Sequence, residues 1–298
     1  MPRIWIVVTA LMLQGVVAHG QQMERAAVDD GEIEYEVQGS GEPVLLIHGA
    51  HIADAFAPLM DQSALEDYQL IRYRRRGYAG SAPAGGPPEE FLRQAAADAA
   101  ALLDHLDIDR AHIAGHSSGG VIGLQLAMDH PDRVGSLMLL EPALMTVPSG
   151  EQFGEKLQPS FDYYEAGDPT AAVDSFMTVV AGDQWRDFAS ASMPGAVEQA
   201  NADAATFFEL EAPAVMAWRR DEAVLDAFDR PVLYLWGSES GKVIGVEAAY
   251  REGRDLVKDW FPQTHEHHIE NINHALQMQD AQAVAEGMAA FLRANSLP

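Results

Sequence analysis

The stretch Ala111-His112-Ile113-Ala114-Gly115-His116-Ser117-Ser118-Gly119 decides the fold. It opens with a short strand-like run, Ala111–Ala114, and a helical pattern follows from Ser118 to His130, just before Pro131. A strand that turns directly into a helix is the setting in which G-x-S-x-G forms a tight, strained elbow. Glycines at both flanks remove β-carbons that would collide in such a turn. We therefore expect Ser117 to stand exposed at the end of a strand, as a candidate nucleophile.

Strand-like and helical patterns alternate on both sides of this stretch. Pro43–Ile47, Val134–Leu140 and Pro231–Trp236 are continuous apolar runs, which are typical of parallel strands covered on both faces. Weaker strand patterns are found at Gly31–Val37, Leu70–Tyr73 and His267–Ile272, and helical patterns at Glu89–Leu106, Val246–Trp260 and Ala281–Ala294. This alternation predicts an α/β domain built on a parallel sheet.

The alternation is interrupted between Pro148 and Asp229. This segment has helical spacing, no convincing strand pattern and many aromatic residues, among them Phe153, Phe176 and Phe207. We expect one α/β domain formed by residues 21–147 and 230–298, with residues 148–229 as a helical insertion.

The chain is strongly acidic. Its 298 residues include 45 Asp and Glu against 19 Lys and Arg, which gives a formal net charge of −26. Such a polyanion is repelled by nucleic acids and by anionic membranes, so neither is an expected partner. Adaptation to high salt and an ordinary acidic enzyme are both compatible with this charge. The chain has no cysteine, which excludes thiolate catalysis and disulfides.

The first 20 residues resemble a secretory signal peptide. Arg3 precedes an apolar run from Ile4 to Ala18, and Ala18-His19-Gly20 has small residues at the positions that precede a cleavage site. The run is short for a membrane span. We expect a secreted or periplasmic protein; the alternative is a buried or anchoring N-terminal helix.

A serine nucleophile needs a base within hydrogen-bond reach, and His274 is the best candidate. It lies in Asn273-His274-Ala275, after the last strand pattern and before the final helix. The other histidines are interpreted as surface or packing residues. The cluster His265-Glu266-His267-His268 has the composition of a metal site, but alternation along a strand would point its members to opposite faces. We expect neither a metal nor a cofactor.

The acid that would orient the histidine has two candidates. Glu141 ends the run Val134–Leu140 and is followed by Pro142, whereas Glu239 lies after Pro231–Trp236 between two serines. A buried carboxylate at either strand end could hold the imidazole. Each also has a structural interpretation, as a loop anchor for Glu141 and as a solvated charge for Glu239.

Backbone amides that follow two strands could hold a developing oxyanion. His48-Gly49 closes the strand Pro43–Ile47, so the next amide, that of Ala50, can pair with the amide of Ser118 at the start of the helix. The His48 side chain is expected to hold this loop in place.

Taken together, these residues resemble the α/β-hydrolase superfamily. Four segments carry the resemblance: Leu45–Gly49, Arg76–Ser81, Gly115–Gly119 and Asn273-His274. The resemblance extends from about Gly31 to Leu297. It implies an eight-stranded, mostly parallel sheet with helices on both faces, a Ser/His/acid triad, and a helical cap, which residues 148–229 would supply.

Two departures from the family pattern affect the interpretation. The position where relatives often carry the acidic aspartate is Ser240 here, and branches that resemble haloalkane dehalogenases instead place a glutamate near the end of the preceding strand. We therefore favour Glu141 over Glu239. Arg74 stands where many relatives have aspartate, which is expected to affect loop packing more than catalysis.

The resemblance also bears on the reaction. Haloalkane dehalogenases and epoxide hydrolases of this superfamily use aspartate at the elbow, so Ser117 favours acyl transfer. We expect a serine hydrolase that cleaves a carboxylic ester or related acyl compound, with Ser117, His274 and Glu141 as the triad and Ala50 and Ser118 as the oxyanion hole. The aromatic-rich insertion favours a small, apolar acyl substrate, although the aromatics could form the cap's own core. Hydrolysis of a C–C bond, cofactor-free perhydrolysis and a ligand receptor that retains its triad are the alternatives.

Overall fold

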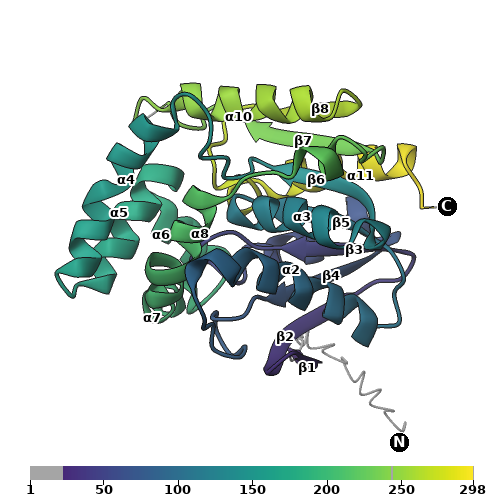
Figure 1. The fold of residues 1–298 in the computed structure, drawn as a ribbon, viewed down its shortest axis with the longest axis horizontal. Helices are drawn as coiled ribbons and strands as arrows, with labels where there is room; N and C mark the ends of the chain where they lie inside the picture. The colour runs from purple at the N-terminus through teal and green to yellow at the C-terminus, as the bar shows by residue number, and fades with distance from the viewer. Residues whose placement is uncertain (1–22, 243, 298) are drawn as a thin grey trace, which may run out of the picture.

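The structure is a computed structural model, and it describes residues 23–242 and 244–297 (Figure 1). The predicted signal peptide at residues 1–20 lies outside the described residues. Within the described part of the chain, no helix is both long and apolar enough to cross a membrane.

Eight strands form one sheet in the order β1-β2-β4-β3-β5-β6-β7-β8. The β1–β2 and β2–β4 pairs are antiparallel, and every other neighbouring pair is parallel. This confirms the predicted eight-stranded, mostly parallel sheet. The strands are β1 (Glu24–Val28), β2 (Gly31–Gln38), β3 (Glu42–Ile47), β4 (Tyr68–Arg74), β5 (Ala111–His116), β6 (Val134–Leu140), β7 (Val232–Gly237) and β8 (Thr264–Ile269).

Helices cover both faces of the sheet because its central strands are apolar on both sides. In β3, Leu45 and Ile47 belong to one buried cluster, whereas Val44 and Leu46 belong to another. The first cluster includes residues of α2 (Pro88–His105), α3 (Ser118–Asp129) and α10 (Glu247–Trp260), and the second includes residues of α1 (Ala57–Met60) and α11 (Ala281–Ala294). Alternate side chains of one strand therefore fill two separate cores.

The segment between β6 and β7 is helical, and we call residues 148–229 the cap. Its helices α4 to α7 gather at one end of the sheet, on the left in Figure 1. Its helical elements are α4 (Gly150–Glu165), α5 (Pro169–Ala181), α6 (Trp185–Ser192), α7 (Ala196–Ala202), a single π-helical turn η3 (Thr206–Glu211), α8 (Ala212–Ala217) and α9 (Glu222–Leu225). The cap has its own buried cluster, which includes Trp185 and Phe208 and also reaches Ile52 and Ala275 of the α/β domain.

Two strands differ from the sequence-based prediction. Strand β1 has no counterpart among the predicted strands, because only Ala26 of its five residues is buried and the strand shows no apolar alternation. The last strand was predicted at 267–272 but runs from Thr264 to Ile269. Its side chains are mostly polar and only Ile269 is buried, so hydrophobicity gave no signal for its start.

Candidate active site

Ser117 lies on a sharp turn between β5 and α3 with φ 54° and ψ −122°, a backbone conformation that is strained for any residue with a side chain. Both flanking glycines are required by close packing. A β-carbon at Gly115 would lie 2.3 Å from the carbonyl oxygen of Gly119, and one at Gly119 would lie 2.1 Å from the carbonyl oxygen of Ile47. The turn is also tied to the end of β6, because the Ser117 amide donates to the Leu140 carbonyl over 3.0 Å.

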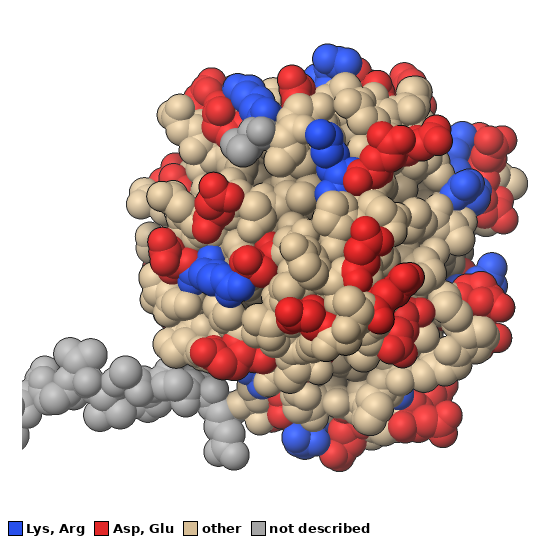
Figure 2. Space-filling view, turned by 90° about the vertical axis from the view of Figure 1, so that its left-hand side faces the viewer, with Lys and Arg blue, Asp and Glu red and all other residues tan. Residues whose placement is uncertain are grey.

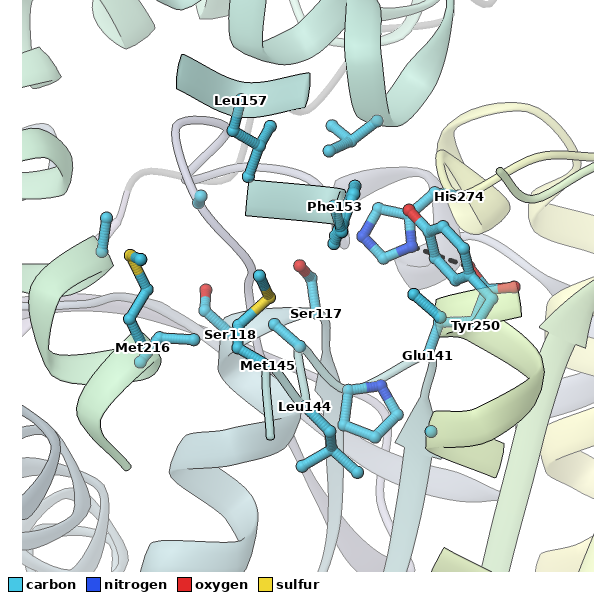
Figure 3. A pocket seen from close by; sticks show the side chains of 18 of the residues that line it. Ser117, Ser118, Glu141, Leu144, Met145, Phe153, Leu157, Met216, Tyr250 and His274 are labelled. Carbon is cyan, nitrogen blue, oxygen red and sulfur yellow. Dashed lines mark hydrogen bonds and ion pairs between the residues drawn. The ribbon is translucent and has the colours of Figure 1, made fainter. Parts of the chain in front are cut away.

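His274 and Glu141 form a buried pair beside this turn. Nδ1 of His274 lies 2.7 Å from Oε2 of Glu141, and the other carboxylate oxygen accepts a 3.0 Å hydrogen bond from the Gly237 amide. Both side chains are almost fully buried. Figure 3 shows Ser117, His274 and Glu141 next to one another, with the Ser117 hydroxyl on the side of the imidazole ring. Three chain segments far apart in the sequence thus meet at one point.

Glu239, the alternative acid, does not contact His274. Its carboxylate accepts hydrogen bonds from Lys242 over 2.9 Å and from the Ser238 hydroxyl over 3.0 Å, and its side chain is 44% exposed. The Lys242 ammonium lowers the pKa of Glu239. Ser240 is buried and occupies the family's usual acid position, while Glu141 supplies the carboxylate from the neighbouring strand.

His116, which was predicted to be a surface or packing residue, holds the candidate base in place. Its Nε2 donates to the backbone carbonyl of His274 over 2.8 Å, and the two rings lie 4.8 Å apart. Burial and, to a lesser extent, the nearby His274 ring lower the pKa of His116 to about 3, so His116 is neutral near pH 7. Its position next to Ser117 in G-x-S-x-G was the only sequence signal for this role.

The two predicted oxyanion donors line the same cavity as Ser117. Ser118 is the first residue of α3, so its amide has no carbonyl four residues earlier within the helix. Ala50 follows β3 and lines the cavity beside Ser117 and His274. Ala50, Ser117 and Ser118 therefore line one cavity.

The cavity above Ser117 is largely apolar and has an empty volume of about 790 Å³, including its solvent-filled mouth. The α/β domain and the cap both contribute to its wall, as Figure 3 shows for Leu144, Leu157 and Met216. Four cap aromatics line it: Phe153, Phe161, Phe176 and Phe207. Phe176 and Phe207 also belong to the cap's buried cluster, so the aromatics of the insertion serve both purposes considered above.

A smaller hollow adjoins the same residues. It shares Ser117, His274 and Ala50 with the large cavity, and its other lining residues include Ala181, Ala275, Met278 and His116. Two spaces of unequal size thus adjoin Ser117.

Arg74 packs against the loop after β3, as its position suggested. Its guanidinium forms ion pairs of 2.6 Å with Asp54 and 2.7 Å with Glu34. Among the described residues, which include the histidines of β8, no group of three His, Asp or Glu side chains could hold a metal ion.

Comparison with known proteins gives the family. The model of the family described as alpha/beta hydrolase fold matches residues 42–281, and the chain therefore belongs to this family. Among curated proteins, the chain is 36% identical over 127 residues to a fluoroacetate dehalogenase from Burkholderia sp., over 40% of each chain. It is 34% identical over 111 residues to a putative carbamate hydrolase RutD from Azorhizobium caulinodans, over 37% of this chain and 41% of that one. The alignments thus span about two fifths of these relatives' length.

Solved structures match over nearly the whole chain. An enol-lactonase from Burkholderia xenovorans superposes with a TM-score of 0.72 at 21% identity, over 91% of this chain and 100% of that one. A thermophilic esterase from Thermogutta terrifontis superposes with a TM-score of 0.69 at 21% identity, over 92% and 98%. At 21% identity, this structural similarity is evidence for a shared fold alone.

Proposed function

We propose that this protein is a serine hydrolase that cleaves carboxylic esters of apolar acids through an acyl-enzyme. One observation carries the proposal: the buried Glu141–His274 hydrogen bond of 2.7 Å lies beside a serine on a strained elbow, at one wall of an apolar cavity. A nucleophile, a base and a group that orients the base form the constellation that acyl transfer requires.

The geometry supports a distinct role for each group. Because Glu141 accepts from Nδ1, the proton of neutral His274 resides on Nδ1, and Nε2 is free to take the proton of Ser117. Ser117 then attacks the ester carbonyl, and the amides of Ala50 and Ser118 hold the oxyanion. His274 returns its proton to the leaving alcohol. Water repeats the sequence on the acyl-enzyme and releases the acid.

The two spaces around Ser117 support a substrate with one long and one short arm. The large apolar cavity suits an acyl chain, and the smaller hollow next to Ala275 and Met278 suits a small alcohol. Lactones are internal esters and need the same chemistry. The enol-lactonase among the structural neighbours supports their inclusion among the test substrates.

A chain-length series of p-nitrophenyl esters tests this function. From acetate upward, kcat/KM should rise by up to about fourfold per methylene until the chain fills the cavity, because each buried CH₂ contributes about 0.8 kcal/mol. Leu157→Trp should move the optimum to shorter chains, because Leu157 lines the cavity. Gln158→Trp, an exposed position of the same helix, should leave the optimum unchanged.

Ser117→Ala is the control for the site itself. It should abolish turnover and fluorophosphonate labelling while the fold remains intact, a loss on the order of 10⁴ to 10⁶ in rate. Release of p-nitrophenol that stops near one equivalent with every ester and lactone would contradict the proposal and indicate a ligand receptor instead.

A further inference from the structure

A buried ion pair joins the loop after β4 to the cap. Nη2 of Arg75 lies 2.9 Å and 3.1 Å from the two carboxylate oxygens of Glu211, the last residue of η3. The Arg75 and Glu211 side chains are 1% and 0% exposed. The Tyr78 hydroxyl donates to the same carboxylate. Taking two opposite charges out of water is costly, and the pair contributes little net stability compared with apolar side chains of similar size.

The same guanidinium also reaches the loop after β3. Nη2 of Arg75 donates to the Gly49 carbonyl over 2.9 Å. His48 completes this contact, because its Nε2 accepts from the Arg75 amide over 3.0 Å and its Nδ1 donates to the Gly49 carbonyl over 2.7 Å. Burial and the positive charge of Arg75 lower the pKa of His48 well below its ordinary value, so this imidazole is neutral. The Gly49 oxygen therefore accepts two hydrogen bonds, one of them from a cation.

The Gly49 carbonyl and the Ala50 N–H belong to one peptide group. In a trans peptide these two bonds point in opposite directions, so a cation bound to the oxygen lies behind the N–H. The peptide is a resonance unit, and a charged donor at its oxygen draws electron density from its nitrogen. The hydrogen on the Ala50 nitrogen then becomes a stronger donor. Donors that are oriented before the reaction stabilise an oxyanion most effectively.

We propose that Arg75 is a positioning residue of the oxyanion hole: it fixes and polarises the Gly49–Ala50 peptide, and Glu211 anchors it from the cap. This inference rests on the proposed function, because it assigns the Ala50 amide to the oxyanion. It also gives the cap a role in the chemistry. The carboxylate that balances the Arg75 charge comes from η3. The cap must therefore be packed against the α/β domain for the Gly49–Ala50 peptide to be polarised.

The unpaired atoms of Arg75 support a role beyond stability. Within the described part of the chain, its buried Nε and Nη1 have no hydrogen-bond partner. Each unsatisfied buried donor lowers the free energy of unfolding. Two guanidinium nitrogens thus make no hydrogen bond to any described residue, whereas Nη2 donates to both Gly49 and Glu211.

The double variant Arg75→Met/Glu211→Gln tests the inference. It removes the cation and the counter-charge together and leaves an acceptor for Tyr78, so no buried charge is left alone. With p-nitrophenyl butyrate, kcat should fall by about 10- to 100-fold, less than or similar to the loss of one oxyanion donor, while KM changes by less than about twofold.

A trifluoromethyl ketone with an apolar chain supplies the second readout. Ser117 adds to its carbonyl carbon, the serine proton passes to His274, and the ketone oxygen becomes an oxyanion like that of the reaction. Its inhibition constant should rise by about the same factor as kcat falls, because both report stabilisation of that oxyanion.

The matched control is Arg76→Met/Asp98→Asn. This neighbouring ion pair is also largely buried, with contacts of 2.8 Å and 2.9 Å, and Asp98 lies on α2. Its kcat and ketone affinity should stay within about threefold of the wild type.

If a folded Arg75→Met/Glu211→Gln variant has the same kcat and the same ketone affinity as the wild type, the inference is overturned and Arg75 is a purely structural residue. If that variant does not fold, Arg75→Lys provides the test of the inference. Lysine keeps the positive charge but lacks the planar guanidinium that binds two acceptors at once. Both kcat and ketone affinity should therefore fall by about threefold or more. Unchanged values would again overturn the inference. A wild type that hydrolyses no ester would instead refute the proposed function.

Discussion

Glu141 combines burial with an unusual backbone. Its φ of 45° lies in a region that few residues other than glycine adopt, and its amide donates to the Leu235 carbonyl over 3.2 Å. Its carboxylate is held by Gly237 and faces His274. Strained residues of this kind persist where the surrounding structure fixes them, and they cluster at functional sites. The strain at Glu141 matches that at Ser117, so two of the three candidate triad residues are held by their backbone.

The two glutamates can be separated by mutation. Glu141→Gln should lower kcat by about 10⁴, because His274 then loses the partner that sets its tautomer and orientation. Glu239→Gln should keep nearly full activity, because among the described residues its carboxylate accepts hydrogen bonds from Ser238 and Lys242 and not from His274. Steady-state kcat with one good ester checks both. The reverse pattern would assign the acid to Glu239, and two mild losses would mean that either carboxylate can serve.

Among the structural elements, the loop after β3 contains a second buried histidine besides His48. The His51 ring packs against the cap, 4.4 Å from the Phe207 ring and 5.0 Å from the Phe176 ring. Neither ring nitrogen has a hydrogen-bond partner among the described residues. The pKa of His51 is lowered to about 3, mainly by burial and to a lesser extent by the positive charge of Arg75.

This shift predicts a loss of stability in acid. Above pH 6.5 His51 is neutral in both states, whereas between about pH 6.5 and 3 the unfolded chain binds a proton that the folded loop excludes. Lowering the pH from 7 to 5 should therefore cost about 2 kcal/mol of unfolding free energy through this residue. His51→Phe should remove that part of the loss, as measured by urea unfolding at both pH values.

The control for this experiment is His265→Phe. His265 is exposed on β8, and although its ring packs edge-on against Phe291 with 5.9 Å between centroids, it remains accessible to water in the folded chain. Its replacement should leave the pH dependence of stability as in the wild type. An unchanged pH dependence in His51→Phe as well would contradict the assigned cause.

The elements could be predicted from the sequence where hydrophobicity determines them. The parallel strands β3, β5, β6 and β7 are buried on both faces and carry an apolar signal, and the elbow at Ser117 has a local signature. Strands β1 and β8 at the two sheet edges bury few side chains, so the signal fails there. The ion pair between Arg75 and Glu211 joins residues 136 positions apart. No local pattern encodes such a contact, and only the folded chain reveals it.

At the scale of the whole molecule, negative charge dominates. Figure 2 shows acidic side chains spread over the visible face, with fewer basic ones between them. With a formal charge of −26, mutual repulsion among these groups opposes the compact state, and salt screens that repulsion within a Debye length of about 3 Å at 1 M. The surface therefore links stability to ionic strength.

We expect the melting temperature to rise as sodium chloride increases from about 0.1 M to about 2 M, since the Debye length shortens over this range. Sodium sulfate should be tested in parallel, because sulfate stabilises most proteins by exclusion from their surface. A rise in both salts indicates relief of charge repulsion. A melting temperature that responds to sulfate alone would mark this as an ordinary acidic protein without adaptation to salt.

The wall of the large cavity also determines how oxidants would damage this molecule. The chain has 12 methionines and no cysteine, so its thioethers are the sulfur atoms open to peroxide. Met145 and Met216 line the cavity, and Met216 is 52% exposed. Conversion to the sulfoxide would place a polar group in the apolar wall of the cavity, while the buried sheet is shielded. Oxidative stress would thus change which molecules enter the site before it unfolds the protein.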